Sequence, residues 1–559
     1  MNWTKFPVYL MTALLVLVTG LLGFLWMLQE NFPLSVEVIS DGGSETIGLW
    51  YRDNCYHVFL PGYADPDQVI LHTNRLTSVS IDGRQITDGE ICGGFPLSEP
   101  LRLTYQRRGQ SHERTILFVR SSDTPALFID TVSGSMDSIH EEKGNSEAGY
   151  LRLYDTAGEL NCDAQIQAIA GRGNSTWEAD KKPYSLELAS PRDLLGMGAA
   201  KKWILLANAY DVTHINNKMC FDFARSVGCA YTPECQWVDL YLNGEYAGLY
   251  LLSERNELDP ERIAVDAERS FLLSLSSDWQ LDKSLPHIQS DRRLFLRIHQ
   301  QGLSDSRIRQ IWQSTENAVY ADDGIDPVTG KHWTELIDMD SWARQFLLDE
   351  VFVDYDAFAL SQFFYYEPDS GKLFGGPIWD ADNILDRSAE HPANILAAQR
   401  PYVWNEVETP LCWMLWQKEE FRQQVKALYR EEFRAGLLAL AESGIDDYVN
   451  QCRGAAAMDA VRWTKSGADA ESARMAQYLR ERVAFLDDYW TNEEEFVHLD
   501  IGSDAQWRRF AVRKGDTALF LREHSSLLAQ AQWERFDTRA PFDLSEPVRE
   551  NTVLWMVLP

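Results

Sequence analysis

Short apolar stretches separated by polar turns fill the first part of the chain. Between residues 34 and 122, alternating or apolar runs such as VEVIS, LRLTYQ and TILFVR lie between turn signals such as Asp82-Gly83 and Gly93-Gly94. Regular short strands between glycine-bearing turns are typical of an all-β sandwich. We therefore predict a β-sandwich domain over residues 34–122, which acts as a spacer or a binding module.

The pattern becomes mixed after residue 126. Apolar strand-like runs come first, and two of them flank Asn243-Gly244, which is the strongest short signal for a tight β-hairpin. Helical spacing of apolar residues appears at Asn216–Val227 and dominates from Pro410 onward. Strands followed by helices predict an α+β domain over residues 126–493. Short strands resume afterwards and predict a small β module over residues 497–559.

The N-terminal stretch is apolar for long enough to cross a bilayer. Pro7 to Leu28 contains no charged residue, and a transmembrane helix needs about 20 apolar residues. The run lacks a small-residue cleavage site, so we predict an uncleaved transmembrane anchor at residues 7–28. Lys5 precedes it and acidic residues follow it. The positive-inside rule then predicts a cytoplasmic N-terminus at residues 1–6 and an extracytoplasmic bulk, as in a single-pass cell-membrane protein.

Composition narrows the possible functions. The net charge is −32, and a surface this acidic argues against sequence-independent binding of nucleic acid. The eight cysteines form no C-x-x-C pair, so the sequence gives no support for a zinc site. Outside the cytoplasm some of them could be bridged, for example Cys55 with Cys92, although buried free thiols are the alternative for most.

Carboxylates gather in one stretch, GKLFGGPIWDADNILD, which runs from Gly371 to Asp386. Asp380 and Asp382 follow a Gly-Gly-Pro turn there, and a second acidic pair, Asp354 and Asp356, ends a helical pattern upstream. Carboxylates on turns are the ligands that Mg²⁺ and Mn²⁺ prefer. The stretch is therefore a candidate metal site, with solvated or helix-capping acids as the alternative.

A glycine-bearing turn with polar side chains lies earlier, at Gly171–Thr176, in the sequence GRGNST. In the strand that follows, Lys182 has the same period-two phase as Tyr184 and Leu186. A lysine on the apolar face of a strand points inward, where it must be paired or reach a ligand. The alternative is a lysine that reaches solvent near the start of the strand.

Several of these pieces together resemble the CotH kinase family, named for a bacterial spore-coat protein. In order they are RGNSTW with KKPYSLEL, KKWILLANAYD with NNKMCFDFAR, VDLYLNGEYAGLYLLSE, the acidic helix end, GPIWDADN, and YLRERVAFLDDYW. The resemblance covers roughly residues 126–490. It implies an atypical, two-lobed protein-kinase-like fold that transfers phosphate from ATP with Mg²⁺ or Mn²⁺, often outside the cytoplasm. The C-terminal FDLSEPVRENTVLWMVLP resembles part of a Listeria–Bacteroides repeat, which is a small β-grasp-like module.

The resemblance assigns roles to the acidic residues. In kinases the catalytic base precedes a β-hairpin and the metal-binding aspartate follows it. Asp356 then corresponds to the base, with Asp354 as its substitute, and Asp380 to the principal metal ligand. Asp382 and Asn383 would support the metal. Where a typical kinase has a second metal-binding asparagine, this chain has Ser361.

The resemblance also implies a nucleotide site. Lys182 would contact the phosphates, and no glutamate partner for it is evident in the sequence. Arg172, Asn174 and Ser175 would cover the phosphates, and Glu254 would touch the nucleotide.

Three functions are consistent with these features. The first is an anchored extracytoplasmic kinase that phosphorylates Ser or Thr of cell-surface or coat proteins. The second is a kinase-like surface scaffold that no longer transfers phosphate, which Ser361 favours. The third is a carbohydrate-active enzyme that uses two carboxylates, but it leaves Lys182 and the RGNST turn unexplained.

Overall fold

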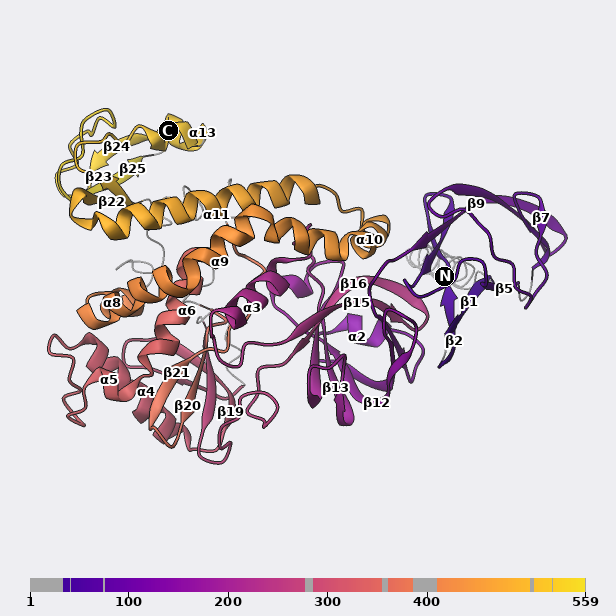
Figure 1. Cartoon of the computed structure of the whole chain (residues 1–559), viewed down its shortest axis with the longest axis horizontal. Coiled ribbons are helices and arrows are strands. Elements are labelled where there is room, and N and C mark those ends of the chain that lie inside the picture. The colour runs from indigo at the N-terminus through magenta and orange to yellow at the C-terminus, as the bar shows by residue number, and fades with distance from the viewer. Residues whose placement is uncertain are drawn as a thin grey trace, which may run out of the picture. The chain divides into compact units, whose positions relative to one another are not determined.

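The computed structural model describes residues 34–40, 42–73, 76–276, 285–353, 360–385, 410–502, 507–524 and 526–557. The chain divides into two compact units (Figure 1). The first comprises residues 1–136, 150–163 and 239–248, and the second comprises residues 137–149, 164–238 and 249–559.

Two sheets make up the first part of the chain. A three-stranded sheet has the order β2-β1-β5, and a six-stranded sheet has the order β3-β4-β9-β8-β6-β7. Burial alternates along β8, where Leu101, Leu103 and Tyr105 point inward, as the period of a strand requires. The bounds are β1 (Ser35–Ser40), β2 (Gly43–Gly48), β3 (Trp50–Arg52), β4 (Cys55–Leu60), β5 (Ile70–His72), β6 (Thr77–Ile81), β7 (Arg84–Gln85), β8 (Pro100–Arg107) and β9 (Gln110–Arg120).

A closed barrel of seven strands follows, in the order β10-β11-β12-β13-β14-β16-β15. It closes where β10 pairs in parallel with β15, with Ala126 opposite Asp239. The predicted hairpin is confirmed, because Asn243 and Gly244 join β15 to β16 with φ of 50° and 80°. The strands are β10 (Ala126–Thr131), β11 (Ser146–Tyr154), β12 (Leu160–Gly171), β13 (Tyr184–Asp193), β14 (Ala199–Leu206), β15 (Cys235–Leu242) and β16 (Glu245–Glu254).

The second unit contains a five-stranded sheet with the order β18-β19-β17-β20-β21. Its apolar face shares a core with helices α3, α4 and α6, where the rings of Trp342 on α6 and Phe364 on β20 lie 4.8 Å apart. Short helices α2 (Asp137–Glu141) and α5 (Trp333–Leu336) connect larger elements. The others are α3 (Asn216–Ser226), α4 (Asp305–Tyr320), α6 (Met339–Phe352), β17 (Phe271–Ser276), β18 (His287–Gln289), β19 (Phe295–Gln301), β20 (Phe363–Glu367) and β21 (Lys372–Gly375).

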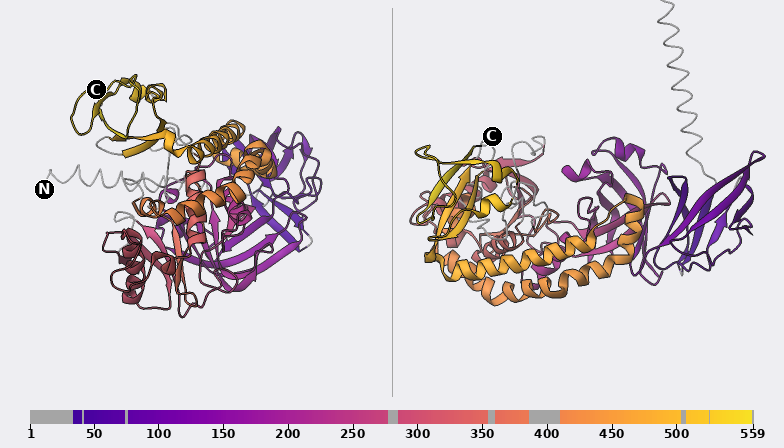
Figure 2. Two further views of the ribbon diagram at one scale, coloured as in Figure 1. Left: turned by 60° about the vertical axis from the view of Figure 1, so that its left-hand side comes forward. Right: turned by 90° about the horizontal axis from the view of Figure 1, so that it is seen from above.

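Long helices form a layer in the second half of that unit. Helices α10 and α11 run side by side in Figures 1 and 2, and Gly467 at φ 102° lies in the turn between them. Arg482 of α11 forms an ion pair with Glu350 of α6, and both side chains are completely buried. The helices are α7 (Pro410–Trp416), α8 (Glu419–Leu428), α9 (Arg434–Ala439), α10 (Ile445–Trp463) and α11 (Ala468–Thr491), with π-helical turns at Tyr429–Phe433 and Leu440–Gly444.

The C-terminal part is a four-stranded sheet with its own small core. Its order is β23-β22-β25-β24, and its central strands β22 and β25 are parallel. Leu499, Phe510 and Trp533 pack inside it. Its elements are β22 (Phe496–Gly502), β23 (Trp507–Arg513), α12 (Phe520–His524), α13 (Ser526–Gln530), β24 (Gln532–Arg535) and β25 (Thr552–Val557).

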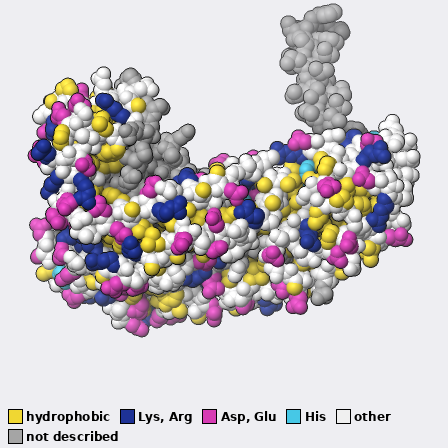
Figure 3. All heavy atoms as spheres, turned by 45° about the horizontal axis from the view of Figure 1, so that its top comes forward, with side chains coloured by type: hydrophobic (Ala, Val, Ile, Leu, Met, Phe, Trp, Pro, Cys, Tyr) yellow, Lys and Arg dark blue, Asp and Glu magenta, His cyan; other side chains and the backbone are white. Residues whose placement is uncertain are grey.

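Charged side chains of both signs are interspersed on the face that Figure 3 shows. On the helical layer, Arg453 lies 3.1 Å from Asp469, and Arg434 lies 2.7 Å from Asp487. These surface ion pairs neutralise individual carboxylates locally but leave the net charge unchanged, and each contributes little to stability.

The predicted fold class needs correction. The α+β character is present, but the sheet-rich half closes into a barrel, and the described residues form several further sheets, which the predicted two-lobed kinase arrangement did not include. Closure depends on the distant pairing of β10 with β15, and no local sequence pattern encodes that contact. The transmembrane helix was also part of the predicted fold class, and the structure does not support it. Residues 7–28 lie outside the described residues, and no helix within the described ranges is long and apolar enough to span a membrane.

Candidate functional site

The segment after β21 forms a turn that we call the aspartate loop, residues 376–383. Asp380 in this loop has φ of 66°, a left-handed conformation that non-glycine residues seldom adopt. The hydroxyl of Ser361 donates a hydrogen bond to Oδ2 of Asp380 at 2.8 Å. Ser361, which occupies the position of the expected asparagine, therefore lies directly beside the predicted metal ligand.

The first turn of α3 holds the aspartate loop from the other side. Oδ1 of Asn217 accepts a hydrogen bond from the backbone N–H of Ala381 at 2.9 Å. The side-chain amide of Asn216 donates to the carbonyl of Asp382 at 3.4 Å. Both asparagines are buried. The loop is therefore attached to a helix from a distant part of the chain, because the two hydrogen bonds join residues that are 164 and 166 positions apart.

The glycine-bearing turn, residues 171–176, is called the glycine loop. Its Arg172 places the guanidinium 5.5 Å from the ring centre of Trp379, which belongs to the aspartate loop. Burial lowers the pKa of Arg172, while the nearby charges of Asp380 and Asp382 oppose that shift. The structure thus brings together Arg172 and two carboxylates that the sequence separates by about two hundred residues.

The two neighbouring lysines have different environments. Lys182 is only partly buried, and its ammonium group donates to the carbonyls of Trp177 at 2.8 Å and Ala179 at 3.4 Å. It also lies 4.5 Å from the ring centre of Trp177. The buried lysine is Lys181. The period-two argument that pointed Lys182 inward was wrong, because β13 begins only at Tyr184 and the alternation does not extend back to residue 182.

Lys181 belongs to a buried polar cluster that the sequence analysis missed. Its ammonium nitrogen lies 2.6 Å from Oδ1 of Asp459 on α10 and donates to the carbonyl of Leu249, also at 2.6 Å. The same oxygen of Asp459 accepts from the backbone N–H of Leu249 at 2.8 Å. Nε2 of His214 lies 3.3 Å from the other oxygen.

Charge outweighs burial at Asp459, whereas burial outweighs charge at His214. Burial alone would raise the pKa of Asp459, but the charge of Lys181, followed by His214, lowers it well below its usual range. Burial lowers the pKa of His214, which Asp459 partly counteracts. One signal could have revealed Asp459, because it shares a helical face with the buried Cys452 and Ala455 of α10, where an aspartate is unusual.

The other predicted residues occupy distinct places. Glu254 ends β16, accepts from the backbone N–H of Glu234 at 2.8 Å, and pairs with Arg262 at 2.5 Å. Asn174 and Ser175 are exposed at a short 3₁₀-helix that begins at Ser175. Their roles, like that of Glu254, stay predictions. Asp354 and Asp356 lie outside the described residues.

The metal prediction concerns Asp380, Asp382 and Asn383. Within the part of the chain that the structure describes, no group of three or more His, Cys, Asp or Glu side chains is arranged to hold a metal ion. The two carboxylates and the amide do offer hard oxygen donors within four consecutive positions, which suits Mg²⁺ or Mn²⁺. Arg172 beside them suits an anionic group such as a phosphate.

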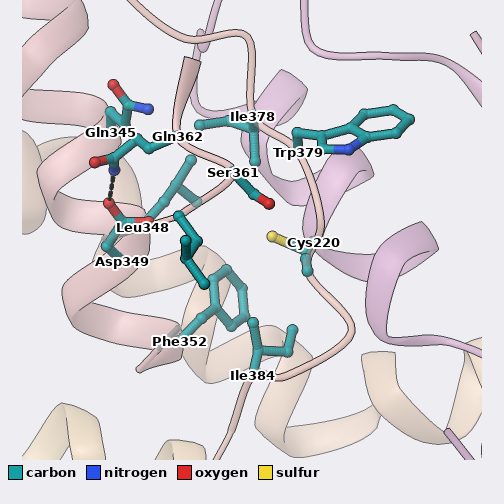
Figure 4. Close-up of a pocket in the computed structure, with 12 residues that line it drawn as sticks. Cys220, Gln345, Leu348, Asp349, Phe352, Ser361, Gln362, Ile378, Trp379 and Ile384 are labelled. Atoms are coloured by element: carbon teal, nitrogen blue, oxygen red, sulfur yellow. Dashed lines mark hydrogen bonds between the residues drawn. The ribbon is translucent and has the colours of Figure 1, made fainter. Parts of the chain in front are cut away.

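A small cavity of about 20 Å³ lies beside the aspartate loop (Figure 4). Ser361, Trp379, Cys220, Gln362 and Asp349 are among its lining residues. Burial raises the pKa of Asp349 well above its ordinary value, and the side-chain amide of Gln362 donates to its carboxyl group. A cavity this small accommodates about one water molecule. It is therefore a packing cavity adjoining the loop, and a nucleotide cannot occupy it.

Comparison with known proteins gives one informative result. The family model described as CotH kinase protein matches residues 169–486, which is more than half of the chain. This chain belongs to the CotH kinase family. The matched range contains the glycine loop, the aspartate loop, Lys181 and Asp459. Membership of a kinase family indicates the use of ATP and a divalent cation in general.

Other comparisons add little to the CotH assignment. No curated protein matches the chain. Among solved structures, a presumed glycoside hydrolase from Bacteroides thetaiotaomicron is 12% identical, with 50% of this chain and 88% of that chain covered and a TM-score of 0.12. A TM-score this low supports no conclusion about fold or function.

Proposed function

We propose that this CotH family member is an extracytoplasmic protein kinase that transfers the γ-phosphate of ATP to Ser or Thr of cell-surface or coat proteins. One observation carries the proposal: the guanidinium of Arg172 in the glycine loop lies 5.5 Å from the ring centre of Trp379 in the aspartate loop, close enough to feel the charges of Asp380 and Asp382. A kinase needs a cationic group for the phosphates and carboxylates for the metal that bridges them.

Different residues would perform different parts of phosphoryl transfer. Asp380, with support from Asp382 and Asn383, would hold a divalent cation, which neutralises charge on the β- and γ-phosphate oxygens. Arg172 would contact the phosphates, and the backbone of the glycine loop would cover them. Lys182 donates to the carbonyls of Trp177 and Ala179, which directly follow the glycine loop, so it would act on the phosphates through the conformation of that segment.

The bond changes follow ordinary phosphoryl transfer. The oxygen of the acceptor hydroxyl forms a bond to the γ-phosphorus, and the bond from that phosphorus to the β–γ bridging oxygen breaks. ADP leaves with the electron pair of that bond. Asp356 is the residue that we assign to accept the hydroxyl proton.

The second candidate function is a kinase-like surface scaffold without catalytic activity. The hydrogen bond from Ser361 to Asp380 favours it, because a hydroxyl that donates to the metal ligand occupies the place where a typical kinase has a second metal-binding asparagine. Both candidate functions are compatible with nucleotide binding, whereas only the kinase transfers phosphate. Transfer of phosphate is therefore the decisive measurement.

The experiment incubates the purified full-length chain with Mn²⁺ or Mg²⁺ and γ-labelled ATP, and measures label on the chain and on added surface proteins. Asp380→Ala should reduce labelling by more than about 100-fold, because it removes the principal metal ligand. Asp369→Ala is a matched control, since Asp369 is exposed on the neighbouring hairpin and pairs only with the exposed Arg269 among the contacts described.

The outcomes separate the hypotheses. Equal labelling by the wild type and Asp380→Ala would overturn the assignment of the site. If the wild type transfers no label, yet Mn²⁺ with ATP at about 100 times its Kd stabilises it by roughly 2.7 kcal/mol, the scaffold is the better description. Absence of both effects would refute a nucleotide-dependent function.

A further inference from the structure

One segment contacts both loops of the site. We call residues 208–217 the bridging segment, because it runs from just after β14 into the first turn of α3. The hydroxyl of Tyr210 donates to the carbonyl of Ser175 in the glycine loop at 2.9 Å. Seven residues later, Asn217 accepts from the N–H of Ala381 in the aspartate loop at 2.9 Å. The two candidate binding loops are thus connected through a single short piece of chain.

The bridging segment is itself firmly held. The carboxylate of Asp211 accepts from the N–H of Thr213 at 2.8 Å and from the N–H of Asn216 at 2.9 Å. Lys465 donates to the carbonyl of Asn208 at 2.8 Å. His214 faces Asp459 in the buried cluster. A segment with this many buried hydrogen bonds keeps its outward contacts at a fixed spacing.

The conformation of Asp380 needs such support. A left-handed non-glycine residue persists only when its surroundings determine it, and such residues gather at functional sites. Two contacts determine it here. The bond from the N–H of Ala381 to Asn217 fixes the peptide that follows Asp380, and the bond from Ser361 fixes its carboxyl group.

We propose that Asn217 is a positioning residue that holds Asp380 in the orientation needed to bind a divalent cation, and that Tyr210 on the same segment positions the glycine loop for the phosphates. This inference rests on the proposed kinase function. It assigns a role to the start of α3, which touches neither metal nor nucleotide itself.

The test uses two variants of similar size in the full-length chain. Asn217→Leu removes the acceptor oxygen, whereas Asn217→Asp keeps an acceptor for the N–H of Ala381. The concentration of free Mn²⁺ is followed by electron paramagnetic resonance during titration, first without nucleotide and then with ATP. Asn217→Leu should weaken Mn²⁺ binding by about 10–100-fold, as loss of a group that orients a metal ligand does. Asn217→Asp should bind Mn²⁺ as the wild type does.

A matched control comes from the hairpin between β15 and β16. Asn243 accepts from the N–H of Thr131 at 2.8 Å through the same side-chain oxygen, far along the chain from the aspartate loop. Asn243→Leu should lower thermal stability but leave Mn²⁺ affinity unchanged. Tyr210→Phe removes only a hydroxyl and should weaken ATP binding with little change in Mn²⁺ binding.

The results distinguish failure of this inference from failure of the function. Wild-type affinity in Asn217→Leu, or equal losses in Asn217→Leu and Asn217→Asp, would overturn the positioning role. If the wild type binds neither Mn²⁺ nor Mn²⁺ with ATP, the proposed function itself fails. Should Asn217→Leu not fold, Ser361→Ala tests the other support of Asp380, with Ser290→Ala as control because Ser290 donates to the buried Glu316 at 3.0 Å. Wild-type Mn²⁺ affinity in Ser361→Ala would then contradict the inference.

Discussion

Replacing Asp459 by leucine removes the negative member of the buried cluster of Lys181, His214 and Asp459. The side chains of Lys181 and Asp459 are 3% and 0% exposed, and their charged atoms lie 2.6 Å apart. Asp459 also accepts the backbone N–H of Leu249. The change therefore leaves a buried ammonium group without its balancing charge and takes an acceptor from a buried N–H.

The expected cost follows from these two losses. Breaking a buried ion pair by removal of one partner costs about 3–5 kcal/mol, and a buried donor that loses its acceptor costs about 1–3 kcal/mol. The two terms overlap, so we expect Asp459→Leu to lower the free energy of unfolding by about 4 kcal/mol. In the double variant Lys181→Met with Asp459→Leu no buried charge remains unbalanced, and about half of that loss should be recovered.

The free energy of unfolding is measured by guanidinium denaturation, followed by circular dichroism and tryptophan fluorescence. The unfolding transition that moves in the variants is the one to compare with the wild type. Asp469→Ala is the matched control, because Asp469 of α11 forms an exposed ion pair with Arg453 of α10, the helix that also holds Asp459, and its loss should cost under about 1 kcal/mol. A loss in Asp459→Leu as small as in the control would refute the reasoning. A double variant less stable than Asp459→Leu would also refute it.

Two further predictions concern His299 and Lys182. Burial, followed by the charges of Arg297 and Arg255, lowers the pKa of His299 to about 3. Between about pH 6.5 and 3 His299 is therefore protonated in the unfolded state and neutral in the folded state. The free energy of unfolding then falls as the pH falls through this range. In denaturation series at several pH values, His299→Gln should reduce the slope of the free energy of unfolding against pH by up to about 1.4 kcal/mol per pH unit. An unchanged slope would contradict this prediction. Lys182→Met should weaken ATP binding about 10-fold in calorimetric titration while changing stability by less than about 1 kcal/mol. The opposite result, with stability lost and ATP affinity kept, would show that Lys182 is structural.

Local signals in the sequence predicted local structure well. The Asn243-Gly244 hairpin is present with both residues left-handed, and α3 begins at Asn216 as expected. In each case, neighbouring residues contain the whole signal, because turn geometry and helical spacing depend on a few consecutive positions.

The pattern of neighbouring residues could not predict contacts between distant parts of the chain. Lys181 and Asp459 are separated by 278 residues, so no local pattern relates them. Lys182 has the period-two spacing expected of a buried strand residue, but it precedes β13, which begins at Tyr184. The closure of the barrel and the bridge from Asn217 to the aspartate loop depend on similarly distant pairs. Only the family resemblance brought the glycine loop and the aspartate loop together beforehand, since no spacing rule relates them.

The closed barrel has a practical consequence for recombinant work on the isolated kinase region. The family match begins at residue 169, but β10, β11 and most of β12 precede it. A protein truncated at residue 169 would expose the flank of β15 that pairs with β10, and the part of β13 at Glu187 and Leu188 that pairs with the removed residues of β12. Unpaired strand edges promote aggregation. Expression boundaries chosen from family similarity alone would therefore cut through the barrel, and a soluble fragment must start before Ala126.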